Sequence, residues 1–234
     1  MEKILLVAAE AFEFSGILSV CTRSEVLDWP IQYARSAECR GRLLLLAANG
    51  PGPGLVREAV TRAVDREKAD QVVSTGFCGA LEPSLEVGDI VVASCIDAVD
   101  VGRSYTSRAP GCDRSSVTGP VISVDRVVQT AVEKRALRDR GAVAVEMEAA
   151  SVAAWAEERD LPFYCVRAVT DRAAEDFALD FNAARDASGR FNRRRILGSA
   201  LRHPWSGVPE LIRLARRGSV AARNLGEFIV NCCF

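Results

Sequence analysis

Short apolar runs alternate with amphipathic segments along the chain. The runs at 3–9 and 42–48 are almost wholly apolar, which is typical of strands that are buried on both faces of a sheet. The segment from Leu55 to about Lys68 instead mixes charges with apolar residues at helical spacing. Because strands alternate with helical segments, the pattern predicts an α/β fold.

The segment 143–171 shows this alternation most clearly. A short apolar run opens it, a helical stretch follows and is broken at Pro162, and a second apolar run occupies 163–169. Strand, helix and strand in about 30 residues match the size of a βαβ unit. The right-handed crossover of such a unit predicts that its two strands are parallel neighbours in one sheet.

An acidic residue follows each of these two strands. Glu148 comes just after the first strand, and Asp171 closes the second. The carboxyl ends of strands form the edge at which open α/β sheets bind ligands, so both acids could belong to a site. A carboxylate at the start of a helix also offsets the helix dipole. The pattern alone leaves helix capping and ligand binding open.

Four motifs resemble those of the nucleoside phosphorylase and 5′-methylthioadenosine/S-adenosylhomocysteine nucleosidase superfamily. They are Met147-Glu148-Ala149, Arg167-Ala168-Val169-Thr170-Asp171, Gly76-Phe77-Cys78-Gly79-Ala80-Leu81 and Gly88-Asp89-Ile90-Val91. The resemblance implies a three-layer α/β/α sandwich with a central mixed sheet. It also implies cleavage of the bond between a purine and its ribose.

The resemblance assigns a role to each acidic residue. Asp171 would protonate the leaving purine, Glu148 would hold the ribose hydroxyls, and Met147 would pack against the ribose. Glu13 would be the general base that activates water, with Glu10 as the second choice. An ordinary exposed acid at a helix start is the alternative interpretation of Glu13. An aspartate at the base position implies an adenine nucleoside.

The same resemblance predicts which residues form the floor of the nucleoside pocket. A strand is expected to end at Gly76, and a tight turn at 77–80 would bring backbone amides to the site. Cys78 is interpreted as a small lining residue, since the single histidine of the chain, His203, is too distant in sequence to activate it. The lining residues expected from the resemblance are Phe77, Cys78 and Gly79, with Val127 and Val128 nearest the purine.

Two positions favour water over phosphate as the nucleophile. Phosphorylases of the family hold phosphate with an arginine and a serine that flank the motif glycine, whereas this chain has Ser74 and Phe77 there. Anions require fixed cationic groups and amides. Arg103 or Arg108 could still supply a phosphate site, so phosphorolysis remains an alternative. The Gly50–Gly54 turn matches neither a P-loop nor a dinucleotide fingerprint, and we interpret its glycines as structural.

Composition limits the remaining possibilities. The eight cysteines include no CxxC pair, and with one histidine they argue against a zinc site. The reaction that the resemblance implies needs neither a metal nor an organic cofactor, so we expect none. Scattered cysteines and an N-terminus without a charged leader predict a cytoplasmic protein.

The segment 129–140 is expected to be a helix with Glu133, Lys134, Arg135 and Arg138 on its exposed face.

The C-terminal part differs in charge from the rest. Residues 185–227 hold ten arginines against three acids, although the whole chain has a net charge of −1. We expect a catalytic domain at 1–184 and a basic helical extension of it at 185–234. The amphipathic stretch 209–217 could pack on its own domain, which we favour, or lie on the inner face of an anionic membrane. Nucleic-acid binding is disfavoured because no aromatic residues interleave the arginines.

The sequence therefore predicts an enzyme that cleaves the N-ribosidic bond of an adenine nucleoside with a modified 5′ group, by hydrolysis. A phosphorylase is the alternative, acting on a lipid-linked adenosine such as adenosylhopane, because the basic C-terminal tail resembles that of a hopanoid-associated subgroup. A non-catalytic nucleoside-binding protein is the second alternative. The resemblance also implies a homo-oligomer, at least a dimer.

Overall fold

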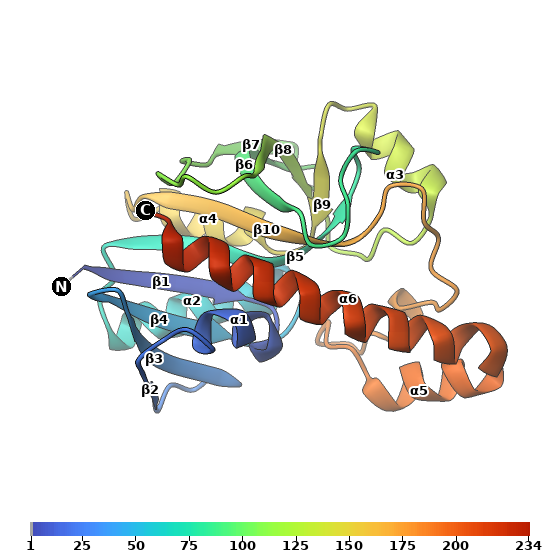
Figure 1. Cartoon of the computed structure of the whole chain (residues 1–234), viewed down its shortest axis with the longest axis horizontal. Coiled ribbons are helices and arrows are strands. Elements are labelled where there is room, and N and C mark those ends of the chain that lie inside the picture. Colours follow the sequence, from blue (N-terminus) through green and yellow to red (C-terminus); the bar gives the residue numbers. More distant parts are fainter. Residues whose placement is uncertain (1) are drawn as a thin grey trace.

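A computed structural model describes residues 2–234, and in this part of the chain ten strands form one mixed sheet (Figure 1). The strands are β1 (Lys3–Ala8), β2 (Arg23–Val26), β3 (Tyr33–Cys39), β4 (Arg42–Ala48), β5 (Gln71–Ala80), β6 (Ile90–Ala98), β7 (Arg103–Thr106), β8 (Val117–Ser123), β9 (Ala144–Glu146) and β10 (Phe163–Asp171). The helices are η1 (Ala11–Phe14), α1 (Ser15–Leu18), α2 (Pro53–Arg66), α3 (Ala131–Arg138), α4 (Ala149–Glu157), η2 (Asn182–Ala184), α5 (Arg193–Arg202) and α6 (Pro204–Asn231).

The sheet curls back on itself around its longest strand. Its order is β10-β6-β8-β9-β5-β1-β4-β3-β2, and β5 also pairs with β10, so five strands close into a ring. The first half of β5 lies beside β1, and its end pairs with β9 instead. The curl brings strand ends from the two halves of the sheet to the same region of the molecule.

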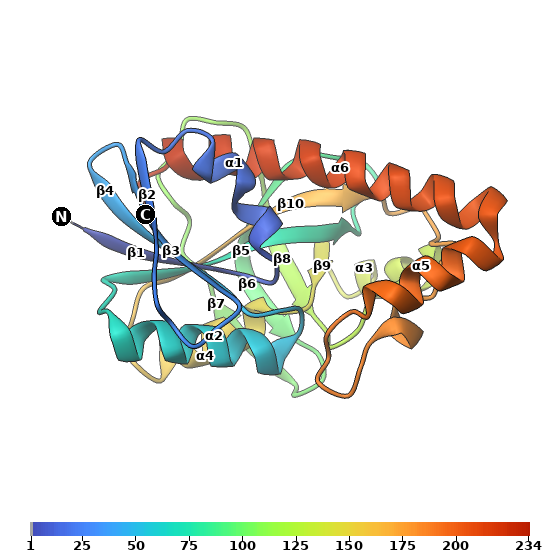
Figure 2. The ribbon, with the colours of Figure 1, turned by 90° about the horizontal axis from the view of Figure 1, so that it is seen from below.

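Helices cover both faces of the sheet, as Figure 2 shows. Apolar residues of α2 and α4, such as Val60 and Trp155, are buried with one face of the strands. Residues of α1 and α6, such as Ile17 and Phe228, are buried with the other face. The expectation of an α/β/α sandwich with a central mixed sheet is confirmed.

Two details of the expected sheet were wrong. β9 is antiparallel to β5, whereas β10 is parallel to it, so the two strands of the segment 143–171 run in opposite directions and not in parallel. The expected turn at 77–80 is absent, because β5 continues through Gly76 with a positive φ of 134° and stays paired with β10. Glycine adopts this backbone conformation without steric cost, so the strand bends and does not end.

Local capping chemistry sets the start of the helices near the site. Thr130 and Glu133 form a reciprocal capping box at the start of α3. α2 begins with Pro53 directly after Gly52, whose φ is 95°. Proline suits the first turn of a helix because its missing N–H is not needed there.

The C-terminal helices continue the fold and then project from it. The last turns of α6 pack on the sheet through Ala221, Leu225, Phe228 and Ile229, which lie beyond the amphipathic stretch 209–217. The first half of α6 and the whole of α5 form a helical hairpin that extends beyond the sheet (Figure 1). The expected boundary at residue 184 falls between η2 and α5.

The described residues show no helix that combines the length and apolar character needed to cross a membrane. Within residues 2–234, no three histidine, cysteine or acidic side chains are grouped closely enough to bind a metal ion.

Candidate functional site

A cavity of about 680 Å³ lies where β5, β9 and β10 meet the loops beyond them. Its volume falls in the range that suits a small organic ligand. All nine residues that the sequence predicts for the site line it: Glu13, Phe77, Cys78, Gly79, Val127, Val128, Met147, Glu148 and Asp171. Glu10 and Glu146 line it as well, so its walls combine five carboxyl groups with a largely apolar surface.

Glu13 is the buried acid at one end of the cavity. Its side chain is at the end of η1, where Oε1 accepts a hydrogen bond from the backbone N–H of Phe77 at 2.9 Å. Its Oε2 accepts a second bond from the backbone N–H of Glu10 at 2.8 Å. Burial raises the pKa of Glu13, although these two hydrogen bonds oppose the shift. Glu13 is thus a fixed, buried carboxyl group and not an exposed acid at a helix start, whereas Glu10 is half-buried at the rim.

Two acids, Glu146 and Glu148, lie at the start of α4, and the sequence left open whether an acid here caps the helix or binds a ligand. The backbone N–H groups of Glu148 and Ala149, at the start of α4, both donate to Oε2 of Glu146, at 2.9 and 2.8 Å. Glu148 makes no capping bond, and its Oε1 accepts from the backbone N–H of Gly52 at 2.9 Å. Glu146 therefore caps the helix, which leaves the Glu148 carboxyl group facing the cavity.

The environment of Glu148 changes its acidity. Burial and the nearby charge of Glu146 raise the pKa of Glu148 to about 7, while the charge of Arg167 opposes the shift. The N–H of Gly52 reaches Glu148 from a turn in which that glycine has a positive φ. Gly52, which we interpreted as structural, thus also orients a site carboxyl group.

Arg167 is the central cation beneath the site. Its guanidinium pairs with Glu146 and donates to the hydroxyl of Ser74 at 2.8 Å and to the carbonyl of Thr75 at 2.6 Å. The side chain is 1% exposed and does not line the cavity. Arg167 is therefore a structural partner whose positive charge compensates that of the buried acids. Its terminal nitrogens already donate to Glu146, Ser74 and Thr75, so they do not bind a substrate anion.

Asp171 is held at the opposite end of the cavity by a lysine that the sequence analysis placed wrongly. The ammonium group of Lys134 lies 2.5 Å from Oδ2 of Asp171 and donates to the carbonyl of Arg172 at 2.7 Å. Lys134 is 1% exposed, so its expected place on the exposed face of α3 was wrong. Thr170 donates from its hydroxyl to Oδ1 at 3.0 Å. Burial raises the pKa of Asp171, and the charge of Lys134 opposes that rise.

Replacement of Lys134 by methionine should change both stability and pH dependence. Breaking a buried ion pair from one side costs about 3–5 kcal/mol, so we expect the free energy of unfolding to fall by that amount. The pKa of Asp171 should rise further without the ammonium group. If Asp171 acts as an acid, the basic limb of the pH profile of kcat/KM then moves to higher pH. Arg135→Met, on the exposed side of the same helix, is the control, and an unshifted basic limb in Lys134→Met would contradict this role.

Gly79 allows Asp171 to approach the floor of the cavity. A Cβ atom on Gly79 would lie 2.8 Å from Oδ2 of Asp171, closer than real Cβ contacts occur. We expect Gly79→Ala to displace this carboxyl group and to lower kcat by about 100-fold, as misplacement by about 1 Å does elsewhere. Gly54→Ala is the control, because a Cβ there meets nothing within 4 Å. Equal kcat values for the two variants would show that the position of Asp171 does not matter.

The outer wall of the cavity is aromatic, and sequence reasoning missed it. Phe177, Phe181 and Phe191 stack edge to face, with ring centroids 5.4 and 6.4 Å apart, and Leu214 of α6 lines the same wall. Phe12 packs edge-on against Phe77, and both rings lie beside Gly218 of α6. Three phenylalanines within the otherwise polar stretch 172–191 were the available signal. The wall offers an apolar subsite next to the acids.

Cys78, Arg103 and Arg108 are the remaining groups that could act as a nucleophile or bind an anion. Burial raises the pKa of the Cys78 thiol well above its usual value, which fits a lining residue and not a thiolate nucleophile. Arg103 pairs with Glu157 at 2.8 Å, and neither Arg103 nor Arg108 lines the cavity. The idea that these two arginines supply an anion site there was therefore wrong.

Comparison with known proteins agrees with this geometry. The sequence model of the phosphorylase superfamily matches residues 34–115 and 95–197, which is more than half of the chain. A 5′-methylthioadenosine/S-adenosylhomocysteine nucleosidase from Neisseria meningitidis, solved with methylthio-immucillin-A, is similar with a TM-score of 0.75 and 20% identity, over 99% of this chain and 98% of that one.

Two other solved structures are similar over nearly their whole length. A futalosine hydrolase mutant from Helicobacter pylori has a TM-score of 0.73 and 16% identity, over 98% of this chain and 97% of its own. The corresponding nucleosidase from S. pneumoniae, with the transition-state inhibitor MT-ImmA, has a TM-score of 0.73 and 18% identity over the same shares. The chain belongs to the phosphorylase superfamily.

Proposed function

We propose that the protein cleaves the N-ribosidic bond of a purine nucleoside, an adenine nucleoside with a modified 5′ group, and that water is the nucleophile. The observation that carries this proposal is the set of three buried carboxyl groups, Glu13, Glu148 and Asp171, around one cavity. A protein that only binds a nucleoside has no need of three acids in one pocket. The similar structures named above include enzymes called nucleosidases and a hydrolase.

The three carboxyl groups match the charges that develop as the bond breaks. The departing purine gains negative charge and needs a proton, which a carboxylic acid with a raised pKa can supply, as Asp171 would. The ribose becomes cationic, and an ionised Glu148 would hold its hydroxyls and stabilise that charge. Glu13 would take the proton of the attacking water, since its carboxyl group is fixed by two backbone N–H groups.

The nucleophile end of the cavity favours water over phosphate. The N–H of Phe77 is already bonded to Glu13, and both terminal nitrogens of the Arg167 guanidinium donate to protein acceptors. The two arginines that line the cavity already pair with carboxylates, Arg126 with Glu133 at 2.6 Å and Arg193 with Glu10 at 3.7 Å. A phosphate beside Glu13 would therefore meet a carboxyl group and not a fixed cation.

The identity of the sugar product tests the nucleophile. Hydrolysis releases the free sugar at the same rate with and without phosphate, and no sugar 1-phosphate forms when phosphate is added. Glu13→Gln should lower kcat by about 10²–10⁴, the usual contribution of a general base. Glu10→Gln is the matched control and should stay near wild type. Strict phosphate dependence, or loss of activity in Glu10→Gln alone, would refute the assignment.

The aromatic wall supports an apolar 5′ group on the substrate. Phe177, Phe181 and Leu214 give this part of the cavity an apolar surface that suits an apolar substituent. A lipid-linked adenosine is the extreme case of such a substrate, and turnover that rises with the length of a 5′-alkylthio chain would support it. We also propose a homodimer, which sedimentation velocity can measure.

A further inference from the structure

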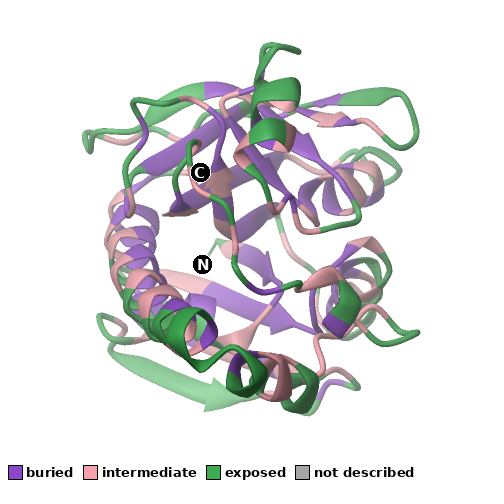
Figure 3. Cartoon of the chain, turned by 90° about the vertical axis from the view of Figure 1, so that its right-hand side faces the viewer, coloured by how far each residue is buried: buried purple, intermediate pink, exposed green. Residues whose placement is uncertain are grey.

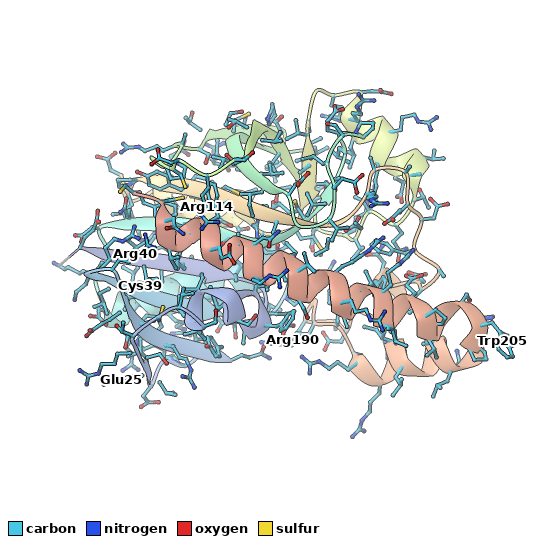
Figure 4. All side chains as sticks on the ribbon, in the orientation of Figure 1. Glu25, Cys39, Arg40, Arg114, Arg190 and Trp205 are labelled. Atoms are coloured by element: carbon cyan, nitrogen blue, oxygen red, sulfur yellow. The ribbon has the colours of Figure 1, made fainter. Side chains whose placement is uncertain are left out.

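The tip of the C-terminal helical hairpin exposes a tryptophan almost completely. α5 ends and α6 begins at His203, and Trp205 follows with 94% of its surface exposed. Figure 4 labels Trp205 at the far end of the hairpin, away from the sheet. The other tryptophans, Trp29 and Trp155, are 9% and 1% exposed. A fully exposed indole at the end of a projecting hairpin indicates contact with something outside the chain.

Other apolar side chains extend this exposed surface along both helices. On α5, Leu197 and Leu201 are four residues apart and therefore lie on one face, at 53% and 62% exposure. On α6, Ile212 is 49% exposed and lies seven residues, or two turns, after Trp205. Figure 3 looks at the molecule from the hairpin side and shows exposed residues on the helical turns nearest the viewer.

The same hairpin is strongly basic. Residues 193–217 contain seven arginines and one acid, Glu210, which is buried. Arg193, Arg213 and Arg217 lie within reach of a carboxylate. The other four pair with no carboxylate among residues 2–234, and all are exposed: Arg194, Arg195, Arg202 and Arg216.

We propose that this hairpin tip docks on the surface of a bilayer that contains anionic lipid. Tryptophan favours the headgroup level of a membrane, where its apolar ring and its N–H are both satisfied. Leucines beside it add apolar area, and unpaired arginines complement anionic headgroups. A partner protein with an acidic surface would satisfy the arginines but would leave Trp205 and the leucines without the half-apolar medium that suits them together.

The hairpin also connects this surface to the cavity. Phe191 and Arg193 at the start of α5, and Leu214 of α6, line the cavity, while Leu197, Leu201 and Trp205 lie further along the same two helices. A docked hairpin would therefore hold the apolar end of the cavity near the bilayer. The docking itself does not depend on the proposed reaction, so the two can fail separately.

Tryptophan fluorescence provides a direct test, because Trp205 is the only tryptophan of the three that is exposed. We expect the emission of the full-length protein to shift to shorter wavelength with vesicles of phosphatidylcholine plus phosphatidylglycerol. Vesicles of phosphatidylcholine alone should have little effect, and about 0.5 M salt should reverse the shift through screening. Sedimentation with the same vesicles should report the same binding.

Variants separate the two parts of the surface. Trp205→Ser should lose most of the vesicle binding, and Arg194→Gln, Arg195→Gln and Arg202→Gln should each weaken it about fivefold. Val132→Ser, at a 75% exposed position of α3, and Arg135→Gln should leave it unchanged. Turnover of a soluble nucleoside should stay at the wild-type level in Trp205→Ser.

Three results would overturn the proposal. One is the absence of binding to the anionic vesicles. Another is binding that survives both Trp205→Ser and removal of the three arginines. The third is self-association that Trp205→Ser abolishes in a protein that ignores vesicles, because the tip would then be an interface between two copies of the chain.

Discussion

Asp171→Asn should lower kcat for purine release by about 10²–10⁴ while it leaves the fold intact. Asparagine has nearly the same shape and can still accept the hydrogen bond from Lys134, but it carries no acidic proton for the leaving purine. We therefore expect the loss in kcat and only a small change in the affinity for a nucleoside. Steady-state kinetics and calorimetric titration with a nucleoside measure the two quantities.

The control for this variant is Asp139→Asn, at an exposed residue just after α3. Its kcat and melting temperature should match those of the wild type, whereas Asp171→Asn should melt at a lower temperature, because the buried ammonium group of Lys134 loses its charged partner. Asp171→Asn that retains kcat within a few-fold would show that the purine leaves without a proton from this residue. A variant that loses binding and kcat together would make Asp171 a binding group only.

Glu148→Gln should abolish most of the activity and yet stabilise the protein at pH 8. Glu148 loses its proton at a pKa of about 7 in the folded protein, against an ordinary value of 4.5. The unfolded chain therefore ionises more easily, and the folded state carries a cost of roughly 3 kcal/mol above pH 7. Glutamine removes that cost and keeps an oxygen for the N–H of Gly52, but it cannot stabilise a cationic ribose.

The sign of this effect fixes its pH dependence. Below about pH 4.5, Glu148 holds its proton in both the folded and the unfolded protein, so it does not destabilise the fold. Between about pH 4.5 and 7 the unfolded chain loses this proton more easily than the folded protein does, so the destabilisation grows with pH. The free energy of unfolding of Glu148→Gln should thus exceed that of the wild type at pH 8 and equal it at pH 4. In the wild type, kcat/KM should fall as the pH drops through about 7, because Glu148 then becomes neutral. Chemical denaturation at both pH values is the measurement, and Glu25→Gln, at an exposed residue, is the control.

A destabilised Glu148→Gln at pH 8 would mean that Glu148 is ionised and paired in the folded protein. That result would contradict a raised pKa of Glu148, because a paired and ionised carboxylate has a lowered pKa. An unchanged activity would exclude Glu148 as the group that stabilises the ribose.

Local patterns were sufficient to predict most of the strands, whereas the acids of the site were assigned by the resemblance to a known family. β1 and β4 are continuous apolar runs, so their positions could be read to within a residue. Asp171 ends β10, Glu148 comes shortly after β9, and Glu13 lies in the helical turn after β1. The pattern could place these acids near strand ends, but only the resemblance brought all three into one site.

Features set by distant contacts could not be predicted. The direction of β9 depends on the curl of the sheet around β5. Lys134 is buried although Val132, two residues before it, is 75% exposed, so α3 contradicts the usual hydrophobic pattern. The reason is a charge 37 residues away, since the Asp171 carboxyl group compensates the buried ammonium. No periodicity within α3 carries that information.

The different roles of two neighbouring acids could not be predicted from the residue pattern either. Glu146 and Glu148 are two residues apart and both precede α4, yet Glu146 caps the helix and pairs with Arg167 while Glu148 faces the cavity. The choice is made by Gly52 and Arg167, which come from other strands and turns. The resemblance to a known family, not the residue pattern, selected the correct acid.

The most direct test of the proposed activity is the release of free purine in buffer without phosphate. Purified protein would be incubated with 5′-methylthioadenosine, S-adenosylhomocysteine and a 5′-alkylthioadenosine of longer chain, and the free base would be separated and measured. We predict release of adenine from at least one of them, with turnover that Asp171→Asn lowers by about 100-fold or more. Tight binding of these nucleosides without any release of adenine, with or without phosphate, would contradict the account and leave a protein that only binds them.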